Sequence, residues 1–194
     1  MPLDTRVMIR AFIALTPSVT LQQSCADVQA VLQRLSLAFR WVKPAQVHLT
    51  LKFLGDIPPE TIDPIACAMQ QTVTTLVPFT MSVRGLGCFP NPTHPRVLWM
   101  GVHAPPDTLQ SLHLRLETAL TPLGFTPDNR PFRPHLTLAR GQQRVHSHQL
   151  TTVLEAYRDR HFGEMLVEHV LLLQSQLYRD GAVYTRLRSV SLQQ

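Results

Sequence analysis

The tetrapeptide His-Leu-Thr-Leu occurs twice in this chain, at residues 48–51 and again at residues 135–138. In a chain of 194 residues with 9 histidines, only about 0.02 copies are expected by chance. Each copy lies in a stretch that predicts a β-strand, where residues i and i+2 point to the same side. His48 and Thr50 should therefore face one way while both leucines face the core, and the second copy should repeat this. Because the copies lie nearly half a chain length apart, we expect two similar halves whose motif strands face each other.

Apolar spacing along the rest of the chain predicts both helices and strands. Helical periodicity marks residues 21–37, 62–76, 109–123 and 147–161. Extended runs cover residues 3–15, 41–42, 47–54, 79–89, 96–102, 133–140, 165–178 and 183–190, with Arg179-Asp180-Gly181 as a hairpin turn before the last. Because several strands follow one another directly, the order favours an α+β fold with antiparallel pairing over a doubly wound parallel sheet. No linker rich in Ser or Gly interrupts the chain, so we expect one domain over residues 1–194.

Composition excludes several classes of protein. The chain has 18 Lys and Arg against 13 Asp and Glu, for a net charge of +5, and because these charges are spread out they favour an anionic partner only weakly. Three cysteines without metal-type spacing predict reduced thiols in a cytoplasmic protein. No stretch is long enough for a membrane span, and the N-terminus lacks the pattern of a signal peptide, so secreted and membrane classes are excluded. A monomer is the default expectation.

Two imidazoles that face each other suit acid–base chemistry. An unperturbed imidazole titrates at about pH 6.5, so one ring can act as general base while the other acts as general acid. The hydroxyls of Thr50 and Thr137 would donate to the oxygens of an anion held between the rings. A zinc site is a poorer explanation, because neither motif has a second His, a Cys or a carboxylate at ligand spacing. His146 and His148 form a more metal-like pair, although surface histidines explain them better.

Two basic residues near the motifs are candidates for phosphate contacts. Lys52 has the same strand parity as the His and Thr of the first motif, so we expect it to contact a backbone phosphate. Arg140 has the opposite parity to the His and Thr of the second motif. It should point away from them unless the strand ends or bulges at Ala139. Aromatic candidates for base stacking, for which core packing is the better explanation, are Phe53, Phe132 and Tyr184.

The residues around both motifs carry a family resemblance. The stretch 41–44, Trp-Val-Lys-Pro, leads into His-Leu-Thr-Leu-Lys-Phe-Leu-Gly at 48–55, and Arg-Pro-His-Leu-Thr-Leu-Ala-Arg covers 133–140. Residues 10–15, residues 89–90 with 95–99, and residues 175–184 match the same pattern. In these stretches the sequence resembles the RNA 2',3'-cyclic phosphodiesterases, also called 2'-5' RNA ligases, of the 2H phosphoesterase superfamily.

This resemblance implies a bilobal α+β unit in which two sheets with flanking helices are related by pseudo-twofold symmetry around a central cleft. It implies hydrolysis of a terminal RNA 2',3'-cyclic phosphate to a 2'-phosphate, without metal or cofactor, and in reverse the joining of RNA ends through a 2'-5' bond. Carried over, His48 would protonate the departing 3'-oxygen and His135 would activate the attacking water. Thr50, Thr137 and Arg140 would hold the phosphate.

Three questions stay open at this point. The same chemistry would serve a cyclic phosphate on a nucleotide or on ADP-ribose. A non-catalytic RNA-binding module would keep the fold and be indifferent to the replacement of either histidine. The two imidazoles are interchangeable under pseudo-symmetry, so the choice of acid and base rests on the resemblance alone.

Overall fold

The computed structural model describes residues 7–141, 147–179 and 181–193. Its strands are β1 (Ile9–Leu15), β2 (Phe39–Trp41), β3 (Leu49–Ile57), β4 (Phe79–Phe89), β5 (Val97–His103), β6 (His135–Gly141), β7 (His161–Val167), β8 (His169–Tyr178) and β9 (Gly181–Ser191). Its α-helices are α1 (Val19–Gln33), α2 (Ile62–Val73), α3 (Thr108–Leu120) and α4 (His148–Ala156). Short 3-10 turns are η1 (Pro44–Gln46), η2 (Pro59–Thr61) and η3 (Thr121–Leu123).

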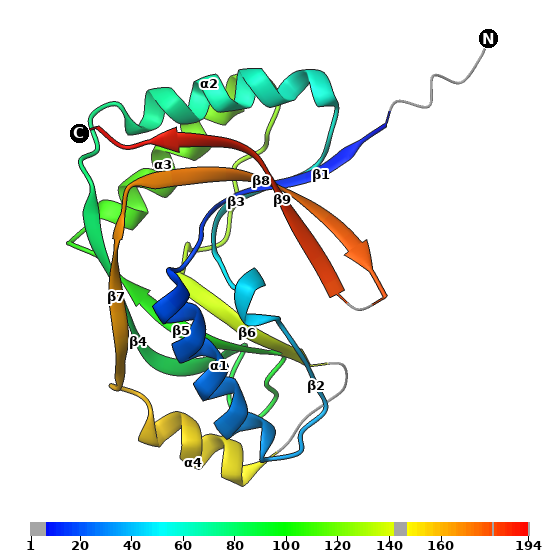
Figure 1. Cartoon of the computed structure of the whole chain (residues 1–194), viewed down its shortest axis with the longest axis vertical. Coiled ribbons are helices and arrows are strands. Elements are labelled where there is room, and N and C mark those ends of the chain that lie inside the picture. The colour runs from blue at the N-terminus through cyan, green and yellow to red at the C-terminus, as the bar shows by residue number, and fades with distance from the viewer. Residues whose placement is uncertain (1–6, 142–146, 180, 194) are drawn as a thin grey trace.

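The strands described form two antiparallel sheets that face each other across the molecule (Figure 1). Sheet A has the order β3-β1-β8-β9, and sheet B has the order β2-β6-β5-β4-β7. The predicted α+β class with antiparallel pairing is therefore confirmed. Each tetrapeptide lies at the start of a motif strand, β3 in sheet A and β6 in sheet B, and these two strands contact each other.

The helices are exchanged between the two sheets. α1 follows β1 of sheet A but packs against β7 of sheet B, and α3 follows β5 of sheet B but packs against β3 of sheet A. α2 completes the cover of sheet A by packing against α3 and β9, and α4 packs against β4. This reciprocal crossing gives the pseudo-twofold arrangement that the repeated tetrapeptide predicts.

One core joins the two halves. Buried apolar residues of both sheets and of all four described α-helices form a continuous cluster. α1 contributes Leu21, Val28 and Leu32 at helical spacing, and Ser18 caps its N-terminus by accepting a hydrogen bond from the Leu21 backbone N–H. The helix also buries Gln29, whose Nε2 donates to backbone carbonyls in the segment after β2 and in β6. The amide therefore ties α1 to the second motif strand.

One sequence prediction about the strands is corrected. Residues 165–178 are not one strand, because β7 belongs to sheet B and β8 to sheet A, with the chain crossing between the sheets at Glu168. Val167 and Val170, on either side of the crossing, are both buried, whereas Glu168 and His169 between them are exposed, so the crossing lies where the apolar pattern is interrupted. Two predicted features, the start of the first strand at residues 3–6 and the turn residue Asp180, lie outside the described residues.

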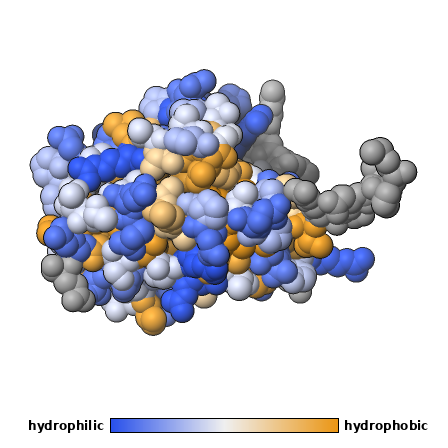
Figure 2. Space-filling model, turned by 90° about the horizontal axis from the view of Figure 1, so that it is seen from above, coloured by the Kyte–Doolittle hydropathy of each residue, from blue (hydrophilic) through white to orange (hydrophobic). Residues whose placement is uncertain are grey.

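The surface mixes polar and apolar side chains. Seen from above, hydrophilic residues cover most of the molecule, with smaller apolar patches between them (Figure 2). Among the described helices, none combines the length and the hydropathy that a membrane crossing requires.

Candidate active site

The two motif histidines have matching backbone contacts. Nδ1 of His48 lies 2.8 Å from the carbonyl oxygen of Gln46, and Nδ1 of His135 lies 2.6 Å from the carbonyl oxygen of Arg133. A carbonyl oxygen can only accept, so each Nδ1 carries the hydrogen and donates it. This contact, to the residue two positions earlier in both cases, orients each ring and leaves its Nε2 to exchange a proton with a bound molecule.

Aromatic rings flank both histidines. The His48 ring lies 4.7 Å from Phe12 and 5.0 Å, edge to face, from Tyr184, measured between ring centroids. The His135 ring lies 5.1 Å, edge to face, from Phe89. These contacts leave both His48 and His135 partly buried.

Burial and positive charge lower the pKa of both imidazoles. For His48 and His135 alike the largest cause is desolvation, partly opposed by the hydrogen bond to the backbone carbonyl, and the charge of Arg140 lowers both further. The charge of His135 also lowers the pKa of His48. The two imidazoles and the guanidinium are therefore within electrostatic reach of one another, and a bound anion would be stabilised by all three.

A β-bulge decides which way Arg140 points. Leu98 of β5 pairs with Ala139 while Trp99 pairs with Thr137, so Leu138 has no partner across the ladder. The extra residue shifts the alternation by one. Both Leu138 and Ala139 are buried, and Arg140 is exposed on the face that carries the His and Thr of the motif. The sequence predicts that Arg140 faces the motif only if the strand ends or bulges at Ala139, and the bulge lies one residue earlier, at Leu138.

The same bulge recurs in the first motif and corrects the prediction for Lys52. Ile13 of β1 pairs with Lys52 and Ala14 pairs with Thr50, which leaves Leu51 without a partner. The shift turns the Lys52 side chain away from the cleft and into the protein. There its Nζ donates to Glu117 at 2.6 Å and to the carbonyl oxygen of Thr126 at 2.7 Å. Simple alternation failed here because it assumes a strand with no inserted residue.

The bulge turns the next residue, Phe53, into the cleft. Phe53 lies five positions after His48, as Arg140 lies five positions after His135, and its side chain is 50% exposed. The Arg10 guanidinium lies 4.7 Å from the centre of its ring. Core packing, the better explanation at first, is therefore wrong for Phe53. It holds for Phe132, which packs against the core and stacks on His113 at 4.3 Å.

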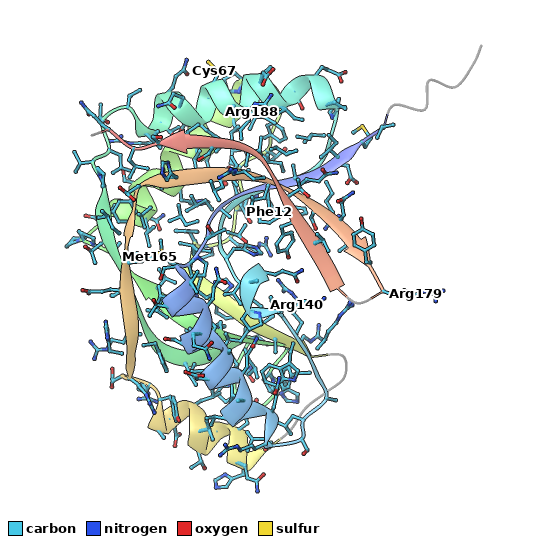
Figure 3. The ribbon with its side chains drawn as sticks, in the orientation of Figure 1. Phe12, Cys67, Arg140, Met165, Arg179 and Arg188 are labelled. Atoms are coloured by element: carbon cyan, nitrogen blue, oxygen red, sulfur yellow. The ribbon has the colours of Figure 1, made fainter. Side chains whose placement is uncertain are left out.

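A cleft of about 550 Å³ lies beside the motif strands. Its lining includes His48, Thr50 and Arg140, together with Tyr184 of β9. His135 and Thr137 are not among its lining residues; they belong to the strand that also carries Arg140, and the charge of His135 acts on His48. Figure 3 shows Arg140 in the space between the sheets, with Phe12 on β1 above it. Of the six predicted site residues, three line the cleft, His135 and Thr137 belong to the neighbouring strand, and Lys52 is turned away from the cleft.

Sequence reasoning missed three basic residues that line the same cleft, Arg10, Arg40 and Lys43. Arg10 and Lys43 belong to stretches that carry the family resemblance, which is the signal that marks them. Arg40 carries no such signal, because its place beside the motif depends on the pairing of β2 with β6.

No group of three or more His, Cys, Asp or Glu that could hold one metal ion occurs among residues 7–141, 147–179 and 181–193. His146 of the metal-like pair lies outside those residues.

A bilobal α+β fold that brings two His-x-Thr strands together beside one cleft defines a phosphoesterase of the 2H class. Comparison with known sequences agrees: the family model described as LigT like Phosphoesterase matches residues 15–99 and 101–184, one segment for each tetrapeptide. The chain belongs to the LigT-like phosphoesterase family.

Relatives and solved structures extend this result. The chain is 32% identical over 177 residues to an RNA 2',3'-cyclic phosphodiesterase of Methanothermobacter thermautotrophicus, covering 91% of this chain and 95% of the relative. It is 31% identical over 179 residues to one from Aquifex aeolicus, covering 92% and 94%. The fold is similar to that of TT0787 of Thermus thermophilus, with a TM-score of 0.80 and 29% identity over 95% of this chain and 98% of that one. It is also similar to Escherichia coli LigT complexed with 3'-AMP, with a TM-score of 0.78 and 25% identity over 97% and 100%.

Proposed function

We propose that this chain is an RNA 2',3'-cyclic phosphodiesterase that opens a terminal cyclic phosphate on RNA to a 2'-phosphate, and that it needs no metal ion. Relatives that bear this name match more than nine tenths of the chain. One observation carries the proposal. Two imidazoles are held alike by backbone carbonyls, each with Nε2 left to move a proton, and both lie within reach of Arg140.

The reaction is an in-line displacement at phosphorus, with attacking and leaving oxygens on opposite sides. In the proposed sequence His135 Nε2 takes a proton from water as its oxygen bonds to phosphorus. The bond between phosphorus and the 3'-oxygen breaks, and protonated His48 supplies the proton that this oxygen needs. Proton exchange with solvent then restores both rings. If a 5'-hydroxyl takes the place of water, the same displacement forms a bond between its oxygen and phosphorus and breaks the bond to the 3'-oxygen, so that two RNA ends are joined through a 2'-5' bond.

Thr50, Thr137 and Arg140 hold the phosphate in this proposal. Hydroxyls donate to non-bridging oxygens, and the guanidinium adds charge-assisted hydrogen bonds that strengthen as negative charge develops. Thr50→Val keeps the volume of the side chain and removes the donor, so we expect a loss of about tenfold in kcat/KM, with recovery in Thr50→Ser.

The test is hydrolysis of an RNA oligonucleotide with a 2',3'-cyclic phosphate end by protein treated with EDTA. Activity should persist, and His48→Ala or His135→Ala should each lose about 10²–10⁴-fold. His169→Ala is a matched control, because His169 is exposed on β8, pairs through Nδ1 with the Ser191 hydroxyl at 3.2 Å and is not among the residues that line the cleft. Activity that disappears with the chelator and returns with a divalent ion would contradict the proposal.

The assignment of acid and base needs its own experiment. A substrate with sulfur in place of the bridging 3'-oxygen has a leaving group that needs no proton. If His48 is the acid, His48→Ala should lose much less activity on this substrate than on the oxygen substrate, while His135→Ala should lose the same on both. The opposite pattern would exchange the two roles.

Two further outcomes correspond to the alternative hypotheses. Higher kcat/KM on a cyclic mononucleotide or a cyclic phosphate of ADP-ribose than on RNA would change the substrate and keep the chemistry. RNA binding without turnover that does not change when either histidine is replaced would indicate a binding module.

We also infer a cytoplasmic monomer of one bilobal domain, supported by the continuous core and by the free thiols of Cys25, Cys67 and Cys88. Light scattering in solution tests the oligomeric state.

A further inference from the structure

Two arginines lie directly opposite each other where β2 pairs with β6. Arg40 and Arg140 are Cα partners in this antiparallel ladder, and both side chains are exposed and line the cleft. Opposed residues hold their Cβ atoms about 4.5–5.5 Å apart, and like charges in that position destabilise a sheet. A negative charge bound between the two guanidinium groups would remove this repulsion.

The described wall of the cleft supplies no such charge. Arg10 and Lys43 add two more cations, and none of the described lining residues is an aspartate or a glutamate. The cleft is therefore a site for an anion larger or more highly charged than one phosphodiester group. Its volume of about 550 Å³ is also in the range of sites that hold a whole small molecule.

Arg40 is held in place from the other side of the cleft. Its Nη2 donates to the carbonyl oxygen of Arg179 at 3.4 Å, which leaves other N–H groups of the guanidinium for a further acceptor. Figure 3 shows Arg179 at the tip of the β8–β9 hairpin and Arg140 between that hairpin and β6. The Arg40 head group thus extends from β2 toward the hairpin, in the cleft that His48 and Arg140 also line.

Resting on the function proposed above, we propose that Arg40 binds a second phosphate that does not react, the one on the 5' side of the cyclised nucleotide, and that Arg140, which contacts the reacting phosphate, lies between the two phosphates and donates to both. Guanidinium groups suit this role, because their planar fork binds phosphate oxygens in pairs. The site then selects an RNA end, in which a phosphodiester precedes the cyclic phosphate, over a nucleoside cyclic phosphate. Exposed rings of Phe53 and Tyr178 in the same cleft offer stacking surfaces for the bases.

Three substrates isolate this contact. They are adenosine 2',3'-cyclic phosphate, the same nucleotide with an added 5'-phosphate, and the dinucleotide ApA with a 2',3'-cyclic phosphate end. The 5'-phosphate adds the charge without a second base, so kcat/KM should rise by about tenfold to a hundredfold from the first substrate to the second. Arg40→Ala should abolish most of this gain, and Arg40→Lys should keep part of it.

Two variants separate the proposed contact from a general effect of charge or folding. Arg115→Ala removes the same charge from α3, outside the cleft, and should keep the full gain. Arg40→Glu places opposite charges across the ladder, so its melting temperature should equal or exceed that of the unaltered protein, whereas the gain from the 5'-phosphate should disappear. Removal of one phosphate contact should also lower the salt slope of log KM on the dinucleotide by about one.

Binding gives the same test without turnover. Adenosine 2'-phosphate and adenosine 2',5'-bisphosphate are product analogues whose affinities calorimetry can compare. If the protein turns over no cyclic phosphate but prefers the bisphosphate through Arg40, the proposed function fails and this inference stands. If turnover occurs and Arg40→Ala keeps the gain, or loses activity equally on all three substrates, this inference is overturned and the proposed function stands.

Discussion

Removal of the Lys52 ammonium should cost stability and not substrate binding. Lys52 and Glu117 form an ion pair of 2.6 Å whose side chains are only 5% and 8% exposed. One partner left alone in such a place is an uncompensated buried charge, which costs about 3–5 kcal/mol of unfolding free energy. In a chain of this size each kcal/mol lowers the melting temperature by about 2–4 °C, so Lys52→Met should melt about 6–20 °C lower.

Urea denaturation measures the loss of unfolding free energy in four proteins: the unaltered chain, Lys52→Met, Glu117→Leu and the double variant. Because the double variant leaves no buried charge, it should be more stable than either single variant. The matched control is the exposed pair Arg84–Asp159, in which Nη2 and Oδ1 lie 3.0 Å apart and the side chains are 53% and 77% exposed. Arg84→Met should cost less than about 1 kcal/mol.

The opposite result would refute this reasoning. If Lys52→Met kept its stability within about 1 kcal/mol of the unaltered protein and raised KM for an RNA substrate, Lys52 would contact the phosphate backbone. The alternation of β3 would then run without a bulge, as the sequence alone predicted.

Other predictions concern pH and packing. Because burial holds the pKa of both His48 and His135 below the ordinary 6.5, the bell-shaped profile of kcat/KM against pH should have its maximum on the acid side of that value. Arg140→Gln should move the maximum to higher pH, since the guanidinium lowers the pKa of both rings, and an unmoved profile would contradict that influence. A Cβ added at Gly87 would overlap the Trp99 ring, so Gly87→Ala should lower the free energy of unfolding by about 1–3 kcal/mol, measured by urea denaturation.

Local pattern was enough to predict most of the architecture. Apolar spacing marks the four helices, and the repeated tetrapeptide places His48 and His135 on strands that contact each other in the fold. Apolar periodicity predicts these helices and strands because each buries one face at a fixed repeat, and that repeat can be recognised from residues close together in the sequence.

The prediction that failed, for Lys52, and the residue that was missed, Arg40, have a common physical cause. The place of each side chain depends on residues far away in the chain. The direction of Lys52 depends on Glu117, which lies 65 positions away, and on a bulge that parity counting does not contain. The position of Arg40 beside the second motif depends on the pairing of β2 with β6, which the sequence of the short strand β2 does not predict. Strand pairing and inserted residues are set by tertiary packing, so a single sequence leaves them undetermined.

The exchange of helices between the sheets bears on how the protein can be divided. If the chain were cut in the loop between β4 and β5, the first fragment would keep α1 but lose β7, the surface on which that helix packs. The second fragment would likewise keep α3 without β3. Neither piece could cover its own apolar faces, so the fragments should regain structure only when mixed, and such complementation would provide a reporter for bringing two fused proteins together.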